Sequence, residues 1–240
     1  MIAVLVTAIV VLGAGLWVFW IEPLGVLGVL ERLTPNIIYR VRTEQPVVAL
    51  SFDDGPNPEF TPQVLEILER HNARATFFLI AERALRYPEV VARVRAAGHE
   101  IGNHWFRDGS ILLQSDDEFT GNLEKTERAL GMTSERKQFR PPGGVAWPRQ
   151  LRLARARGYN CVLGCAYPHD PMQPPVWYIR WLITKNLRPG TIVILHDGIS
   201  DATRGIQAFP DILRVGRERG LQFVSIGELL KAGQVKAEQD

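Results

Sequence analysis

Five short polar clusters hold the side chains of this chain that could act chemically together. Adjacent carboxylates, imidazoles and a guanidinium are the groups with which hydrolases move protons and bind divalent metal ions. Each cluster alone is weak evidence, because Asp, Gly and Pro also form ordinary turns. The clusters are Asp53-Asp54, His104 to Asp108, Arg140 to Gly144, Tyr167 to Asp170 and Leu195 to Gly198.

A metal site is the first chemistry that the spacing indicates. His104 and Asp108 stand four residues apart, which lets both side chains approach one ion, although such a pair alone is more often structural. With Asp54 as a third ligand, the site would keep open positions for water and substrate, as catalytic metal centres do. A metal held there would lower the pKa of its bound water and polarise a carbonyl group. These residues therefore predict hydrolysis assisted by a divalent metal.

The clusters follow predicted strands, at the strand ends where α/β folds gather their active sites. Strands and helices alternate along the chain, which predicts an α/β fold with a parallel sheet, open or closed into a barrel. A helix is expected after the N-cap Thr61, another over 90–98, and a third after the capping box that starts at Ser115. The other expected elements are strands at 47–52, 75–80, 100–102, 161–166, 191–195 and 222–225, and helices at 148–157, 176–186 and 208–219.

Composition limits the class of protein. The chain has 240 residues and a net charge of +2, which suits one globular domain of enzyme size. No dense block of Lys and Arg interleaves with aromatics, so nucleic acid is not an expected partner. Cys161 and Cys165 are too few for a disulfide framework or a structural zinc site, and we expect them to pack as small apolar residues.

Four segments occur in a fixed order and carry a family resemblance. They are VALSFDDGPNP at 48–58, HEIGNH at 99–104, RPPGG at 140–144 and LHDG at 195–198. In this order they resemble the polysaccharide deacetylase family, carbohydrate esterase family 4, over residues 47–230. The resemblance implies a distorted (β/α) barrel that removes N-acetyl or O-acetyl groups from a polysaccharide such as peptidoglycan or a chitin-like glycan.

The resemblance also implies proton roles for four residues. Asp53 would be the general base, and Arg140 would pair with it and hold its orientation. His196 would be the general acid that protonates the leaving amine, and Asp170 would support it. This division is physically sensible, because a carboxylate beside a guanidinium and an imidazole beside a carboxylate take opposite proton roles at one pH.

The metal ligands implied by the resemblance include one departure. Asp54 and His104 match the family pattern, but Asp108 stands where the family usually has a second histidine. Two carboxylates and one imidazole would neutralise a divalent ion, so its water should be less acidic and the optimum pH should shift upward. Zinc is the expected metal, with cobalt, manganese or another oxygen-tolerant metal as alternatives.

Substrate contacts are predicted around the third cluster and the fourth. A backbone N–H near Gly143 would hold the oxyanion, although the family often has an aromatic residue at this position. Trp147 and Tyr167 are expected to contact the sugar, and Trp105 is a further stacking candidate. Trp177 and Trp181 stand at helical spacing, so they are expected to pack in the core instead.

Two other functions compete with deacetylation. One is a glycan-binding protein that kept the fold after its metal site degraded, and Asp108 is the feature that favours it. The other is a phosphoryl hydrolase that would use Asp53 and Asp54, but the chain has no glycine-rich phosphate cradle.

The N-terminal residues differ from the rest in composition. Residues 1–21 contain no charged side chain, and about 20 apolar residues suffice to cross a bilayer as a helix. We expect a single-pass membrane anchor at 1–21, a connecting segment at 22–46, the catalytic domain at 47–230 and a polar tail at 231–240. A glycan substrate places the domain outside the cytoplasm, whereas Arg32, Arg40 and Arg42 weakly favour the opposite orientation.

Overall fold

The computed structural model describes residues 24–134 and 137–237. The chain divides into two compact units, 1–35 and 36–240. In the first unit, the described part forms helix α2 (Leu24–Leu33). The expected anchor at 1–21 lies outside the described residues. Within the part that is described, the helices are too short or too polar to cross a membrane.

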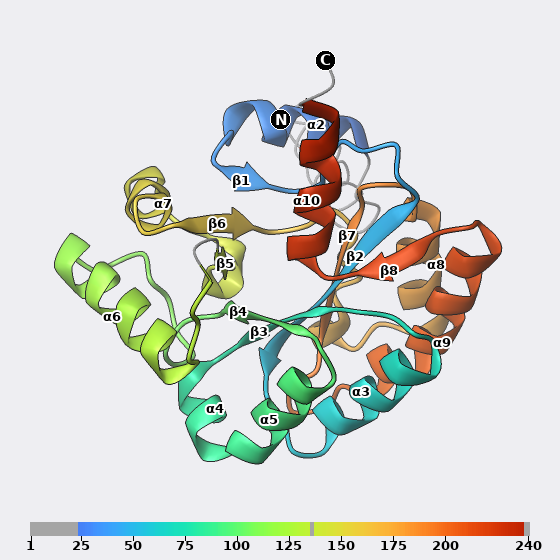
Figure 1. Cartoon of the computed structure of the whole chain (residues 1–240), viewed down its shortest axis with the longest axis horizontal. Helices are drawn as coiled ribbons and strands as arrows, with labels where there is room; N and C mark the ends of the chain where they lie inside the picture. Colours follow the sequence, from blue (N-terminus) through green and yellow to red (C-terminus); the bar gives the residue numbers. More distant parts are fainter. Residues whose placement is uncertain (1–23, 135–136, 238–240) are drawn as a thin grey trace, which may run out of the picture. The chain divides into compact units, whose positions relative to one another are not determined.

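A parallel sheet forms the centre of the second unit (Figure 1). All its ladders are parallel, which confirms the predicted α/β class. A further parallel bridge joins Ala166, beyond β6, to Val193 in β7, so the sheet curls back toward a barrel. Among the described residues eight strands follow this order: β1 (Ile37–Ile38), β6 (Tyr159–Val162), β5 (Lys137–Phe139), β4 (Glu100–Asn103), β3 (Thr76–Leu79), β2 (Val47–Gly55) and β7 (Ile192–His196), with β8 (Gln222–Val224) also paired to β2.

From β2 onward, helices connect successive strands, as crossovers between parallel strands usually do. The capping box predicted at Ser115 is present, with Glu118 as its partner, and α8 has the predicted bounds. Residues 231–237, expected in a polar tail, are helical in α10. The helices of this unit are α3 (Phe60–Arg70), α4 (Ala81–Arg86), α5 (Pro88–Ala96), α6 (Asp116–Ala129), α7 (Pro148–Arg155), α8 (Val176–Asn186), α9 (Thr203–Glu218) and α10 (Ile226–Ala237), with the 3-10 turns η1 (Pro142–Gly144) and η2 (Asp170–Met172).

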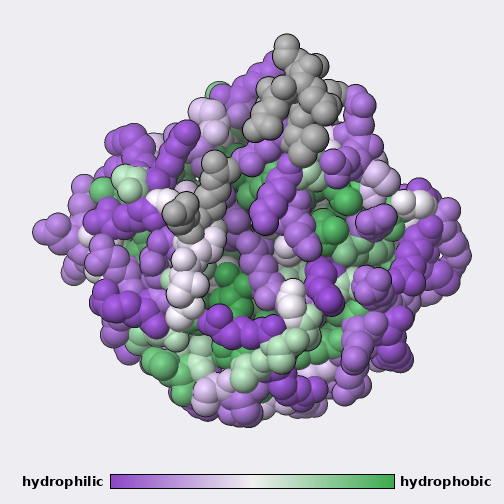
Figure 2. Space-filling model, in the orientation of Figure 1, coloured by the Kyte–Doolittle hydropathy of each residue, from purple (hydrophilic) through white to green (hydrophobic). Residues whose placement is uncertain are grey.

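The core lies on both faces of the sheet, so the central strands are apolar along their length. Strand β2 is buried at every position except Asp54, and both cysteines are buried, as expected. Trp177 and Trp181 are 62% and 39% exposed, so their assignment to the core was wrong. They lie on the outward side of α8, because Ile179 and Ile183 fill the inward side. Hydrophilic residues cover most of the face in Figure 2, with apolar patches between them.

The sheet brings distant clusters together at the carboxyl ends of its strands. Asp53, near the end of β2, is the register partner of His196 at the end of β7. On the other side of β2, Asn103 ends β4 beside Leu79 of β3, and His104 follows directly. Four of the five polar clusters therefore start within a few residues of this one edge.

Candidate active site

Asp53 and Arg140 form a buried ion pair at the carboxyl edge of the sheet. Arg140 Nη1 lies 2.5 Å from Asp53 Oδ1, and both side chains are almost fully buried. The same guanidinium donates to the Ser51 hydroxyl and to the carbonyl of Val162, and it lies over the Phe78 ring at 4.1 Å. These contacts fix the arginine, so it can only present its charge to Asp53. The predicted pairing of the two residues is present in the structure.

His196 and Asp170 form the second charged pair. Asp170 Oδ2 accepts the backbone N–H of His196 at 2.8 Å, and Oδ1 lies 3.0 Å from the ring Nδ1. Burial disfavours a charged ring, but the charge and hydrogen bond of Asp170, with the charges of Asp53 and Asp54, raise the pKa of His196 to about 9. At neutral pH the ring is therefore protonated, which makes it a proton donor.

Asp54 and His104 face each other where a cation would fit. His104 Nδ1 lies 2.9 Å from the carbonyl oxygen of Arg140, which can only accept, so Nδ1 carries the proton. The other nitrogen, Nε2, lies 3.2 Å from Asp54 Oδ1. Two acceptors at this distance need a proton or a metal ion between them. The donor set, one imidazole and one carboxylate, therefore fits a divalent cation.

The electrostatics of Asp54 agree with a cation site. Burial would raise its pKa, but the hydrogen bond and charge of His104, with the charges of His196 and Arg83, lower it below the ordinary value. The backbone of Asp54 has φ of 67°, in the left-handed region that non-glycine residues seldom adopt. Strain of this kind persists where the surrounding structure holds a residue for its function.

Asp108 lies beside this pair but is bonded elsewhere. Its Oδ2 accepts a hydrogen bond from Arg83 Nη2 at 2.7 Å. Across the described part of the chain, no three His, Cys, Asp or Glu side chains are grouped to hold a metal ion. The structure thus brings Asp54 and His104 together, whereas the third predicted ligand pairs with an arginine.

Of the substrate residues predicted from sequence, Gly143 lines the cavity beside the metal pair. Gly143 lines a cavity of about 360 Å³ together with Asp54, His104 and Asp108. The Gly143 backbone is left-handed, with φ of 65°, and a Cβ there would meet nothing within 4 Å, so the place of a side chain is open space.

The aromatic residues of the clusters divide into exposed and buried ones. Trp147 is 51% exposed, and its Nε1 donates to the Leu112 carbonyl, whose residue lines the cavity. Tyr167 lies with its ring centroid 5.7 Å from that of His196. Trp105 is only 3% exposed and stacks on Phe119, so it packs in the core and the proposed stacking role was wrong.

Two residues that matter at this edge had no predicted role in the site, although Asp197 stands in a cluster and was expected to bond the following turn. Arg83 is one, because its helix lies outside every motif. The only signal for it in the sequence was the extra carboxylate at Asp108, which would be stabilised by a nearby positive charge. Asp197 is the other: it is fully buried, and its Oδ2 accepts the Thr61 hydroxyl at 2.5 Å. Burial raises the pKa of Asp197 to about 7, helped by Asp54 and Asp53 and opposed by the Thr61 hydrogen bond.

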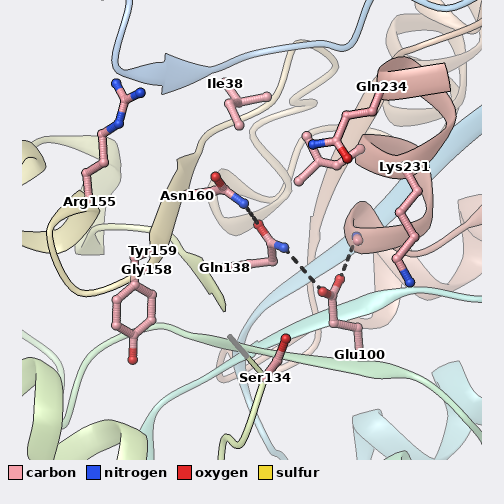
Figure 3. A pocket seen from close by; sticks show the side chains of 12 residues that line it. Ile38, Glu100, Ser134, Gln138, Arg155, Gly158, Tyr159, Asn160, Lys231 and Gln234 are labelled. Atoms are coloured by element: carbon pink, nitrogen blue, oxygen red, sulfur yellow. Dashed lines mark hydrogen bonds between the residues drawn. The ribbon is translucent and has the colours of Figure 1, made fainter. Parts of the chain in front are cut away.

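A second cavity, of about 820 Å³, lies at the amino edge, where β4 and β6 begin. Figure 3 shows its polar side chains joined in a row: Asn160 donates to Gln138, and Gln138 donates to Glu100, both at 3.4 Å. The other oxygen of Glu100 accepts the Thr76 hydroxyl at 2.5 Å and the Gly227 N–H at 2.9 Å. These groups satisfy one another, so the larger cavity is part of the framework.

The carboxyl edge therefore carries groups that suit a hydrolase acting on a carbonyl group: a buried carboxylate, a protonated imidazole, and a carboxylate–imidazole pair whose donors fit a divalent cation. Comparison with known proteins agrees. The family model for polysaccharide deacetylase matches residues 40–162. A peptidoglycan-N-acetylglucosamine deacetylase from Bacillus cereus is 35% identical over 201 residues, which cover 82% of this chain and 94% of that protein. The chain belongs to the polysaccharide deacetylase family.

Solved structures extend the comparison to the fold. The Bc1960 peptidoglycan N-acetylglucosamine deacetylase superposes with a TM-score of 0.76 at 28% identity, over 81% of this chain and 92% of that one. BA3943 from Bacillus anthracis, described as a pseudoenzyme of the CE4 family, superposes with a TM-score of 0.74 at 26% identity, over 84% and 71% of the two chains. The fold is thus shared by a protein named as a deacetylase and by one named as a pseudoenzyme.

Proposed function

We propose that this chain is a metal-dependent hydrolase that removes the acetyl group from an N-acetylated sugar in a glycan, with peptidoglycan as the leading substrate. The observation that carries the proposal is the pairing of Asp53 with Arg140 and of His196 with Asp170 at adjacent register positions of β2 and β7. The names of the relatives support the substrate class.

The two charged pairs divide the proton transfers of amide hydrolysis. Asp53, held by Arg140, accepts a proton from the attacking water. His196, protonated at neutral pH because of Asp170, donates a proton to the leaving nitrogen. Proton transfer by positioned groups of this kind accelerates a reaction by about 10²–10⁴-fold.

A divalent ion, zinc first among the candidates, would be held by Asp54 and His104. When bound, it supplies positive charge that polarises the acetyl carbonyl. The Gly143 backbone lies on the same cavity and can present its N–H to the oxygen of that carbonyl. The exposed ring of Trp147 and the half-buried ring of Tyr167 offer surfaces for a sugar ring.

Acetate release by the full-length chain tests the proposal, with peptidoglycan and acetylated chitooligosaccharide as substrates and an O-acetylated glycan as the variant linkage. We expect release that a chelator abolishes and that added zinc, cobalt or manganese restores. Asp54→Asn should lose both bound metal and activity. Release that survives complete metal removal would contradict the metal-dependent mechanism.

A glycan-binding protein without activity is the second candidate, favoured by the likeness to a CE4 pseudoenzyme and by the Arg83–Asp108 pair. It predicts glycan binding in a folded protein with no acetate release on any of these substrates. Glycan affinity measured by calorimetry on the same preparation separates the two candidates.

We also propose that residues 1–21 anchor the chain in a membrane with the second unit outside the cytoplasm. The absence of charged residues in this run and the location of peptidoglycan support the proposal. Protease added to intact cells should digest the second unit. Protection from protease would contradict this orientation, and release of the chain by alkaline carbonate would contradict the anchor.

A further inference from the structure

Arg83 joins three segments at the candidate metal centre. Its Nη1 donates to the carbonyl of Asp54 at 2.7 Å and also to the carbonyl of Gly198, and its Nη2 donates to Asp108. Asp54 lies near the end of β2, Gly198 follows β7 and Asp108 follows β4. The arginine comes from α4, which follows β3, so its guanidinium connects four separate parts of the active-site edge.

The backbone of Asp54 needs such a connection. It is held in the left-handed region, and its carbonyl lies so close to Gly198 that a Cβ at 198 would be 1.9 Å away. Two loop backbones in contact place carbonyl oxygens near each other, and these repel unless a donor satisfies both. Arg83 is that donor, so it stabilises the conformation that points the Asp54 carboxylate at His104.

The positive charge of Arg83 also compensates the negative charge of the extra carboxylate, Asp108. Two carboxylates and a neutral imidazole around a divalent ion sum to zero. Adding the guanidinium leaves one positive charge, which is what one carboxylate and two imidazoles would leave. Arg83 and Asp108 together therefore substitute electrostatically for one neutral imidazole ligand.

We propose that Arg83 and Asp108 form a positioning unit for the metal centre, in which Asp108 binds Arg83 and not the metal, and Arg83 fixes the backbone of the metal ligand Asp54. This inference rests on the metal site of the proposed function. Asp108 is 64% exposed and Arg83 28%, so the pair lies at the rim of the site, where it acts through geometry more than through burial.

The affinity of the full-length chain for Co²⁺, measured by competition with a chelator, tests the proposal together with the visible absorption of the bound ion. The absorption reports the ligands directly and needs no substrate. Asp54→Asn should abolish stoichiometric binding. Asp108→Asn should bind with an unchanged spectrum and lose about tenfold affinity or less. Arg83→Met should lose about tenfold to hundredfold affinity, as partners of metal ligands do, although arginine cannot ligate the ion.

A matched control lies between the same two segments. Arg107 pairs with Glu82 at 3.3 Å, and these two residues directly precede Asp108 and Arg83 in the chain. The side chains of Arg107 and Glu82 are 66% and 46% exposed. Glu82→Gln should leave Co²⁺ affinity and spectrum as in the wild type. Arg83→Lys, which keeps the charge but only part of the fork, should recover part of the affinity and serves if Arg83→Met does not fold.

Two results would overturn the proposal. One is a changed Co²⁺ spectrum in Asp108→Asn with a loss of affinity as large as in Asp54→Asn, since that would make Asp108 a ligand. The other is Arg83→Met binding Co²⁺ as tightly as the wild type. A wild type that binds no Co²⁺ overturns this inference together with the metal part of the proposed function, whereas a wild type that binds Co²⁺ without releasing acetate contradicts only the proposed function.

Discussion

Two cavities in the second unit are both lined by polar side chains, and they differ in how those side chains are paired. At the amino edge, Glu100, Gln138 and Asn160 are bonded to each other in one row. At the carboxyl edge, Asp54 Oδ1 and His104 Nε2 lie 3.2 Å apart, a separation that needs a proton or a metal ion between them, and Asp54 has a strained backbone. The amino-edge cavity is the larger of the two. Cavity volume therefore does not mark the site. The carboxyl edge is distinguished from the amino-edge row by its strained backbone at Asp54 and by Arg140 Nη2 and Asp197 Oδ1, buried atoms that have no hydrogen-bond partner among the described residues.

The largest expected effect separates the two edges by activity. Asp53→Asn should reduce acetate release by about 10²–10⁴-fold, because an amide cannot accept the proton of the attacking water. Initial rates with peptidoglycan measure the loss, and circular dichroism confirms the fold. More than a tenth of wild-type activity in this variant would remove Asp53 from the role of base.

Glu100→Gln makes the same chemical change at the amino edge and serves as the matched control. It should keep wild-type activity per folded molecule but lose about 1–3 kcal/mol of unfolding free energy, because the new amide N–H₂ faces donors that the carboxylate had satisfied. Loss of activity at unchanged stability would contradict the assignment of the amino-edge cavity to the framework and would indicate that it has a role in activity.

Asp197 should give the next largest effect, because it is an unmatched carboxylate buried at the carboxyl edge. Its Oδ1 has no hydrogen-bond partner among the described residues. Its folded pKa of about 7 exceeds the ordinary 3.8, so the folded state keeps a proton that the unfolded chain releases between these values. The free energy of unfolding should therefore fall as pH rises from about 4 to 7. In Asp197→Asn, urea unfolding at several pH values should show a smaller decrease of unfolding free energy with pH. The same decrease as in the wild type would contradict the assignment of this pH dependence to Asp197.

His196 should give a smaller effect that also weakens as pH rises, although here the fold stabilises the charged form of the group. Its folded pKa of about 9 lies above the ordinary 6.5, so its contribution is complete below pH 6.5 and is lost as pH rises through 9. The stability difference between wild type and His196→Gln should shrink over that range, by about 1.4 kcal/mol for each unit of pKa shift. The unfolding free energies of metal-free wild type and His196→Gln are compared at pH 6 and at pH 10. The same difference between the two proteins at both pH values would argue against the Asp170–His196 charge pair.

The sequence predicted the elements that have their own pattern. The apolar runs at 47–52 and 191–195 became β2 and β7, and Val176–Asn186 became α8. The short strand Lys137–Phe139 was missed, because its residues carry no strand pattern and only the ladders to β4 and β6 fix it. Helix α4 was missed for a similar reason, since six residues are too few for a periodic signal.

The site was predictable where a motif named the residue and not where a contact alone defined it. Asp53, Arg140, Asp170 and His196 come together as the motifs implied. Arg83 has no local signal, because it acts by donating to one carbonyl at the end of β2 and another just after β7. A bond to backbone oxygens depends on the fold, and residue types alone do not encode it.

Closure of the sheet has a further consequence for reactivity. The bridge between Ala166 and Val193 is the seam at which the sheet curls back on itself. Asp170 follows Ala166 on one side of that seam, and His196 follows Val193 on the other. Opening the seam would separate the carboxylate from the ring, and the ring would lose the basicity that keeps its proton at neutral pH. The proton donor therefore exists only in the closed sheet, so closure is a condition for reactivity as well as for stability.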